Sequence, residues 1–158
     1  MKKKFLWALC LLVLSVPLFA DMSREQLQRM YLDYFRSQNI QASIDSDGDI
    51  EFVYEGSYFG EMTFWIIVSE TEADQQYFQV HISGLYQLDT EADRRQASLA
   101  AAVATRRANV AKIYLNSNGT NVMASAEAFL VNPQDFRAVF PKLMQEMDSV
   151  MYYFLDEM

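Results

Sequence analysis

The chain has 158 residues, of which 51% are hydrophobic and 22% are charged, and its formal net charge at pH 7 is −8. A chain of this length can bury a sizeable core as one domain, so neither a metal ion nor a disulfide is needed to hold the fold. The acidic balance argues against nonspecific binding to nucleic acid or to an anionic membrane, since both carry negative charge.

The first 20 residues have the pattern of a secretory signal peptide. Three lysines at positions 2–4 precede an apolar run over residues 5–16, which is short for a membrane span. We expect cleavage after Ala20 and no stable membrane anchor after it. Export is therefore predicted, with the periplasm as the preferred destination and secretion to the exterior as the alternative.

The predicted mature chain, residues 21–158, is expected to be a single domain. It has no cysteine, because Cys10 is the only one, and so it can form no disulfide. Without the three lysines, 10 of the 13 basic residues remain against 21 acidic ones, a formal charge of −11. Attachment of a lipid to Cys10 is the less favoured alternative, because the bulky Leu9 precedes it.

The predicted elements begin with an amphipathic helix over residues 23–38. Ser23 and Gln26 have the spacing of a capping box, and apolar residues then recur at helical intervals. Apolar and polar residues alternate over residues 40–44 and again over residues 50–54. This alternation predicts two strands joined by an acidic turn.

Two further strands are predicted. The segment Met62–Val68 carries apolar side chains on both of its faces, which is typical of a strand that is covered on both sides near the middle of a sheet. A polar loop over residues 69–75 follows, and Phe78, Val80 and Ile82 then alternate along the next strand. The four strands are expected to form a meander.

Residues 89–114 are predicted to form a second helix with an apolar stripe. Small alanines beside the stripe would let this helix approach the sheet closely. A turn at residues 116–119 and a fifth strand over residues 122–129 are predicted next. The stripe consists of Leu99, Val103, Val110 and Ile113.

A last helix is predicted to begin with Asn132 as N-cap and Pro133 at the first helical position. Pro141 is expected to bend it early. This helix has more apolar surface than one face of a small sheet usually needs, at Phe136, Phe140, Leu143, Met147, Val150, Met151, Phe154 and Leu155. The predicted fold is α+β, an antiparallel sheet of about five strands packed by three helices, in the order α-β-β-β-β-α-β-α.

The stretch AKIYLNSNGTNVMASAEAFL, residues 111–130, resembles the second half of the YbjN domain family. The resemblance is carried by Ala111-Lys112-x-Tyr114, by Asn118-Gly119 and by Val122-x-Ala124-x-Ala126-Glu127. It extends more loosely over residues 24–156 through the order of the elements. It implies the fold of type III secretion chaperones, which bind other proteins without catalysing a reaction, and a regulatory role in sensory transduction.

The acidic turn DSDGD has two interpretations. Asp45, Asp47 and Asp49 match the first three ligand positions of a calcium loop, but Gly48 comes two residues early and Gly56 stands where the closing glutamate belongs. Asp-Gly between alternating strands is also a strong hairpin pattern, in which both central residues take positive φ. We therefore predict a hairpin turn and no dedicated metal site, with these three carboxylates as weak candidates for a cation.

His81 is the only histidine in the chain, and alternation places it on the strand face opposite to Val80 and Ile82. A lone histidine acts as a base or ligand only with a partner close in space, and the sequence names none. With one histidine and no cysteine in the mature chain, we expect no enzyme and no cofactor. The alternative function is an envelope protein that binds a small ligand, or an enzyme, with a pocket near His81.

The segment EGSYFGEMTFW, residues 55–65, gathers aromatic residues around two glycines. It is either a recognition surface or a hairpin loop whose rings fold over the core. Tyr58 and Phe59, together with Met151 and Phe154 of the last helix, are the candidates for contact with a partner. The preferred hypothesis is a non-catalytic exported interaction module, regulatory or chaperone-like, that binds a protein partner or a second copy of itself as a homodimer.

Overall fold

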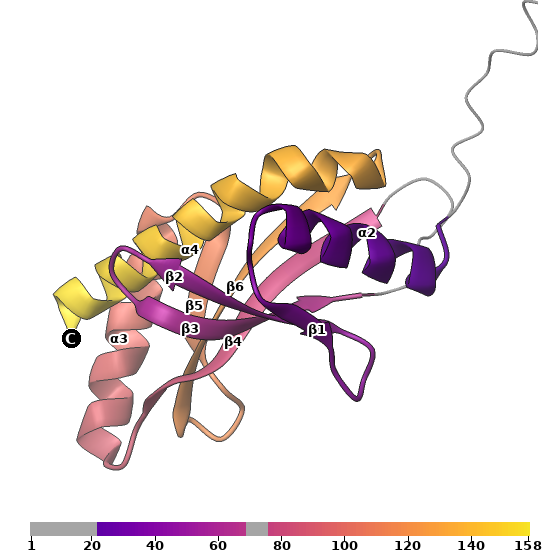
Figure 1. Ribbon diagram of the computed structural model, residues 1–158. Helices are drawn as coiled ribbons and strands as arrows, with labels where there is room; N and C mark the ends of the chain where they lie inside the picture. Colours follow the sequence, from indigo (N-terminus) through magenta and orange to yellow (C-terminus); the bar gives the residue numbers. More distant parts are fainter. Residues whose placement is uncertain (1–21, 69–75) are drawn as a thin grey trace, which may run out of the picture.

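The computed structural model describes residues 22–68 and 76–158 (Figure 1). The predicted signal peptide and the polar loop predicted over residues 69–75 lie outside these residues. In chain order, the elements are α2 (Arg24–Ser37), β1 (Ala42–Ile44), β2 (Ile50–Gly56), β3 (Gly60–Ile67), β4 (Gln76–Gln87), α3 (Glu91–Arg107), β5 (Ala111–Leu115), β6 (Asn121–Leu130), the short 3₁₀ helix η1 (Pro133–Asp135) and α4 (Phe136–Glu157).

The described strands form one antiparallel sheet of six strands in the order β1-β2-β3-β4-β6-β5. The pairing of β1 to β4 in succession is the predicted meander, and β3 lies in the interior of the sheet as expected. The α+β class and the element order are confirmed, although the sheet has six strands rather than about five. The turn predicted at residues 116–119 joins β5 to β6, and Gly119 has a φ of 66°.

Local capping explains where the first two described helices begin. The Ser23 hydroxyl accepts a hydrogen bond from the Gln26 amide, and the Gln26 side chain accepts one from the Ser23 amide at 2.8 Å. Thr90 and Asp93 form a second capping box at the start of α3. Each box satisfies amides that the first turn of a helix leaves without partners.

The helix predicted over residues 89–114 is too long. α3 stops at Arg107, and the following segment forms strand β5. Burial alternates along β5, because Ala111 and Ile113 are buried while Lys112 is exposed. This period of two belongs to a strand, and pairing with β6 stabilises it.

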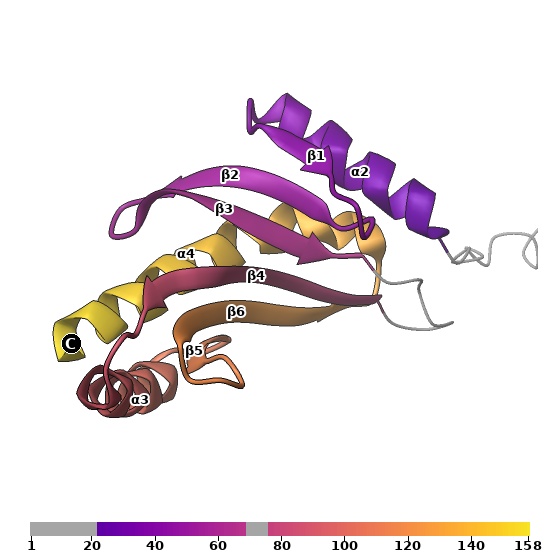
Figure 2. The ribbon, with the colours of Figure 1, turned by 90° about the horizontal axis from the view of Figure 1, so that it is seen from below.

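The buried face of α3 also differs from the predicted stripe. Leu99 is 66% exposed, and Val110 lies beyond the helix and is exposed. α3 packs against α4 and β5, as Figure 2 shows, and small side chains allow that close approach. The buried residues of α3 are Ala97, Ala100, Ala101 and Ala104.

Aromatic rings from α2, the sheet and α4 form the centre of the core. Phe136, at the start of α4, is fully buried and contacts the rings of Tyr31 at 4.5 Å and Phe78 at 5.1 Å. Phe35 of α2 stacks on Phe52 of β2 at 4.8 Å. α2 and α4 therefore lie on the same face of the sheet (Figures 1 and 2), and we call the opposite face the outer face.

α4 begins close to the predicted position. The Asn132 side chain caps η1 by accepting a hydrogen bond from the Gln134 amide at 3.0 Å, and α4 continues from η1. Pro141 lies inside α4 at an exposed position. Of the apolar residues predicted along this helix, all but Leu155 are buried. No described helix combines the length and the apolar character that a membrane crossing requires.

β3 is not covered on both faces, contrary to the prediction. Phe64 and Ile66 are fully buried, but Trp65 and Ile67 on the outer face are only half-buried. The reason is that α2 and α4 both pack on the other face of the sheet.

Candidate functional site

β3 and β4 separate along part of their length. β3 begins at Gly60, but only its residues Trp65–Ile67 pair with β4. The register of β4 is irregular between Ile82 and Tyr86, and such irregularities bend a strand. Beyond this point β3 stays with β2 while β4 stays with β6, so the sheet splits, as Figure 2 shows.

An apolar cavity of about 160 Å³ lies at this split, and we call it the aromatic groove. The β2–β3 hairpin forms one wall, the end of β4 forms the other, and the last turns of α4 form the floor. Its main lining residues are Tyr58, Phe59 and Met62 on the hairpin, Leu85 and Tyr86 on β4, and Met151, Phe154 and Leu155 on α4.

Asp148 of α4 holds the hairpin wall in place. Its carboxylate accepts hydrogen bonds from the backbone amides of Ser57, at 3.2 Å, and Tyr58, at 2.9 Å. Gly56 permits this close approach, because a Cβ there would lie 2.3 Å from the Phe59 ring and 2.6 Å from an Asp148 oxygen. The groove is thus built on a hairpin whose backbone is fixed to the helix below it.

All four residues predicted to contact a partner lie at this groove. Tyr58 is 54% exposed, and its ring lies 4.5 Å from that of Tyr152. Phe59 is half-buried against Phe64. Met151 and Phe154 are each only 3% exposed, so they are core residues that form the floor of the groove and not free surface contacts. They are buried because the face of α4 that carries them packs into the core.

The four residues predicted to contact a partner do not include the rest of the exposed rim of the groove. Leu85, Tyr86 and Leu155 line it, and Tyr86 and Leu155 are about half exposed. Gly84, at a φ of 72°, was the available signal, because a glycine inside a strand often marks a bulge or a bend.

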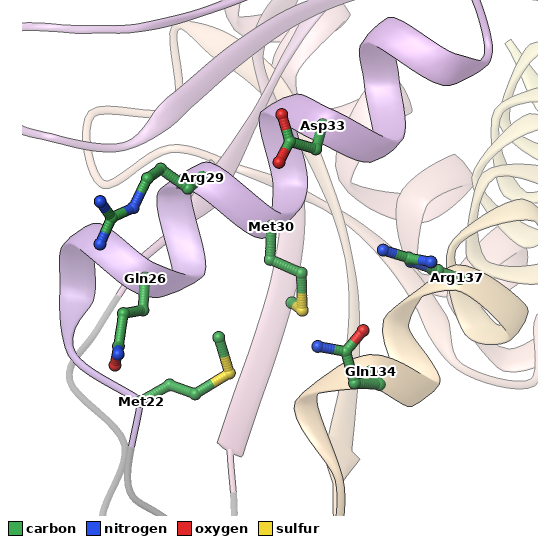
Figure 3. Close-up of a pocket in the computed structure, with 7 residues that line it drawn as sticks. All are labelled: Met22, Gln26, Arg29, Met30, Asp33, Gln134 and Arg137. Atoms are coloured by element: carbon green, nitrogen blue, oxygen red, sulfur yellow. The ribbon is translucent and has the colours of Figure 1, made fainter.

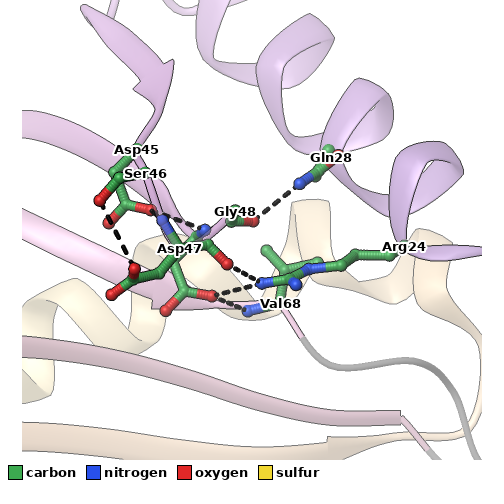
Figure 4. A network of polar contacts seen from close by, with 8 residues as sticks. Arg24, Gln28, Asp45, Ser46, Asp47, Gly48 and Val68 are labelled. Atoms are coloured by element: carbon green, nitrogen blue, oxygen red, sulfur yellow. Dashed lines mark hydrogen bonds and ion pairs between the residues drawn. The ribbon is translucent and has the colours of Figure 1, made fainter.

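The acidic turn is a hairpin turn closed by its own hydrogen bonds (Figure 4). One Asp45 oxygen accepts hydrogen bonds from the amides of Asp47 and Asp49, and one Asp49 oxygen accepts from the amide of Val68 at 2.9 Å. The Arg24 guanidinium donates to the Asp47 carbonyl and lies 3.4 Å from Asp49. The carboxylates of Asp45 and Asp49 therefore already have protein partners.

The prediction that both central residues of this turn take positive φ is wrong for one of them. Gly48 has a φ of 85°, but Asp47 does not take positive φ. The turn spans five residues, since the Asp45 amide bonds to the Asp49 carbonyl and the Gly48 amide bonds to the Asp45 carbonyl. It is therefore longer than the two-residue hairpin turn that the Asp-Gly pair predicted.

Replacing Asp49 with alanine is expected to lower the free energy of unfolding by about 1–3 kcal/mol, because the Val68 amide loses its charged acceptor. Urea denaturation followed by circular dichroism measures this change. Asp47→Ala is the matched control, since among the described residues its carboxylate forms a hydrogen bond only with the exposed Ser46 hydroxyl, at 3.5 Å. The control should change stability by less than about 0.5 kcal/mol. Equal losses in the two variants would contradict the assigned roles.

His81 is half-buried on the outer face of β4. It lies opposite Trp65 of β3 and Ser125 of β6, and its ring is 5.7 Å from that of Trp65. Burial lowers the pKa of His81 below its ordinary value of 6.5, and the negative charges of Asp49 and Asp45 partly oppose this shift. The environment therefore favours a neutral imidazole.

Lowering the pH from about 7 to about 5 is expected to reduce the free energy of unfolding in part through His81. Because its folded pKa is depressed, the unfolded state takes up a proton at a higher pH than the folded state. The stability that the neutral His81 contributes is fully present above pH 6.5 and is lost as the pH falls below that value. His81→Gln cannot titrate, so its unfolding free energy should fall less over this range. An equal fall in both proteins would refute this assignment.

A polar cluster lies beside His81 on the outer face. The Glu127 carboxylate forms an ion pair with Lys112 at 2.7 Å and accepts a hydrogen bond from Gln79 at 3.4 Å. Burial, followed by the Glu127 charge, raises the pKa of Tyr77 to about 12. The carboxylate at the centre of this cluster already has a cation and a donor, which suits a structural role.

A second cavity, of about 430 Å³, lies between α2 and the start of α4 (Figure 3). Arg29 and Arg137 stand on opposite sides of it, with the Met30 side chain between them. Asp33, which also lines it, forms an ion pair with Arg36 at 2.9 Å. Its lining mixes both signs of charge with apolar groups, so it defines no particular ligand.

The described part of the chain contains no recognisable catalytic centre. Within residues 22–68 and 76–158, no three histidine, cysteine, aspartate or glutamate side chains are grouped so that they could hold a metal ion. Nothing in this part of the protein shows a catalytic activity.

Comparisons with known proteins do not assign a family. No family model matches the chain, and no curated protein matches it. Among solved structures, it is similar to an uncharacterized protein from Methanothermobacter thermautotrophicus, with a TM-score of 0.49 and 12% sequence identity over 82% of this chain and 97% of the other. Nothing about function follows from this similarity, and membership of the YbjN family remains a prediction.

Proposed function

We propose that the protein is a non-catalytic, exported interaction module that binds a protein partner at the aromatic groove. The observation that carries the proposal is the convergence of exposed aromatic and aliphatic side chains from three separate elements on one apolar hollow. Tyrosine and other large apolar residues around a desolvated pocket supply much of the energy at protein interfaces. The YbjN resemblance, with its regulatory or chaperone-like implication, agrees with such a role.

The fixed position of the hairpin supports this proposal. Asp148 anchors the backbone beside Tyr58, so the exposed ring is held in place before a partner arrives. A surface ordered in advance loses less conformational entropy on binding. The export part of the proposal rests on the signal-peptide pattern of residues 1–20.

The alternative is a small-ligand or enzymatic pocket near His81. It is supported by the half-buried imidazole and the nearby charges of Asp45 and Asp49. Those carboxylates are occupied by the turn amides, Val68 and Arg24. They are therefore poorly placed to act with His81, and the groove is the better supported site.

Capture of partners from the native host tests the proposal. The purified protein should recover one protein at near-equal amount, as measured by quantitative mass spectrometry. Leu155→Lys places a charge at the mouth of the groove and should abolish this recovery. Leu99→Lys is the matched control, because Leu99 is also an exposed helical leucine but lies on α3, away from the groove. Loss of the partner in both variants, or in neither, would overturn the assignment to the groove.

A further inference from the structure

We propose that the partner enters the split in an extended conformation and adds a short strand to the free edge of β3, with one large apolar side chain in the groove and basic residues beside it. This inference rests on the proposed function and specifies the chemical class of the partner. Three observations carry it: a free strand edge, the size of the cavity, and two opposed glutamates.

The free edge is a consequence of the split. On one side, residues Gly60–Phe64 of β3 pair with β2, from Gly56↔Gly60 to Phe52↔Phe64. On the other side, pairing with β4 begins only at Trp65. Within the described chain, Gly60–Phe64 therefore has strand partners along one edge only, and Met62 on this segment lines the groove.

An unpaired edge favours an extended partner. It presents backbone amides and carbonyls that another strand can pair with. Peptides that bind in this way gain main-chain hydrogen bonds along the edge and gain selectivity from pockets that receive alternate side chains. The split closes at Trp65↔His81, so the added segment is limited to the few residues opposite Gly60–Phe64.

The volume of the groove indicates that it takes a single side chain of the partner. Its volume of about 160 Å³ is below the roughly 300–1,000 Å³ of pockets that take drug-sized molecules. An apolar cavity of about 150 Å³ accepts a group the size of benzene. The floor is formed by Met151 and Phe154, which offer no charge to a ligand. A phenylalanine or a large aliphatic side chain fits this space.

The negative charge near the free edge of β3 favours basic residues beside the apolar side chain of the partner. Glu55 and Glu61 are direct cross-strand partners, both are exposed, and neither forms an ion pair within the described chain. Like charges directly opposite each other destabilise a strand pair. In an added strand, the residues next to the apolar anchor point to the same outer side as Glu61, because side chains alternate. Lysine or arginine at these positions would offset the repulsion.

The probe is the peptide acetyl-Lys-Thr-Lys-Phe-Lys-Val-Lys-amide, titrated into the purified protein by calorimetry. Binding should saturate, and Leu155→Lys should abolish it while Leu99→Lys should not. Replacing the phenylalanine of the probe with alanine should weaken binding roughly 10- to 100-fold, the equivalent of burying one large apolar side chain. Replacing its lysines with glutamate should abolish binding.

Amide hydrogen exchange, read by NMR, tests the strand addition itself. At saturation, the amides of residues 60–64 that face the split should exchange at least about tenfold more slowly, as expected for newly paired strand amides. A probe with N-methylated backbone at the phenylalanine and at alternate positions should lose both affinity and protection.

The outcomes separate the two proposals. If the probe binds at the groove without slowing exchange at residues 60–64, strand addition is wrong while the groove remains a binding site. If the probe does not bind at millimolar concentration, or binds equally with glutamate in place of lysine, the inferred partner class is wrong. In that case the capture experiment with Leu155→Lys still decides the proposed function by itself.

Discussion

Phe136→Ala is expected to lower the free energy of unfolding by about 3–5 kcal/mol, as is typical when a large aromatic side chain is removed from a packed core. Phe136 has no exposed surface, and its ring contacts Tyr31 of α2, Phe78 of β4 and Phe140 of α4. Removing it leaves a cavity where two helices meet the sheet. Urea denaturation followed by circular dichroism measures the loss.

Phe129→Ala is the matched control for this core variant. Phe129 is 69% exposed on the outer face, and its ring contact is with Tyr77 on the neighbouring strand at 5.5 Å. Such cross-strand pairs contribute less than about 1 kcal/mol. If Phe136→Ala cost no more than Phe129→Ala, the packing of α4 on α2 and the sheet would be wrong.

Tyr58→Ala is expected to weaken binding of the recovered partner by about 2–4 kcal/mol, roughly 30- to 1,000-fold in Kd. The Tyr58 ring lies at the groove, is more than half exposed, and is held beside Tyr152. These are the properties of an aromatic anchor that a partner desolvates. Calorimetric titration of the variant against the partner measures the change.

Folding of this variant should be nearly unaffected, because Tyr58 is a rim residue and its backbone amide, which donates to Asp148, is retained. Phe129→Ala again serves as the control, since it removes an exposed ring far from the groove and should leave Kd unchanged. A Tyr58→Ala protein that folds and still binds with wild-type affinity would show that the groove is not the binding site.

The parts of the fold that depend on neighbouring residues could be predicted from the sequence. The capping box of Ser23 and Gln26 and the N-cap at Asn132 are local hydrogen-bonded units, and both occur as expected. Strand β5 could not be predicted in the same way. Its alternation covers five residues directly after an alanine-rich helix, and its stability comes from pairing with β6, which follows it in the chain.

The candidate site was predictable only in part, because some of its residues depend on pairing and packing between separate elements. Tyr58 and Phe59 stand between two glycines at a hairpin, which is a local pattern. Leu85 and Tyr86 reach the groove only because β4 loses its register with β6 and its pairing with β3, and both are long-range properties of the sheet. The burial of Met151 likewise depends on packing that no local pattern encodes.

Site-specific photo-crosslinking in the native host tests the central claim most directly. A benzophenone amino acid at position 155 would lie at the mouth of the groove, and the same amino acid at position 129 would lie on the outer face. We expect one defined protein adduct from position 155 and none from position 129. Adducts to the same partner from position 129 but not from position 155 would contradict binding at the aromatic groove.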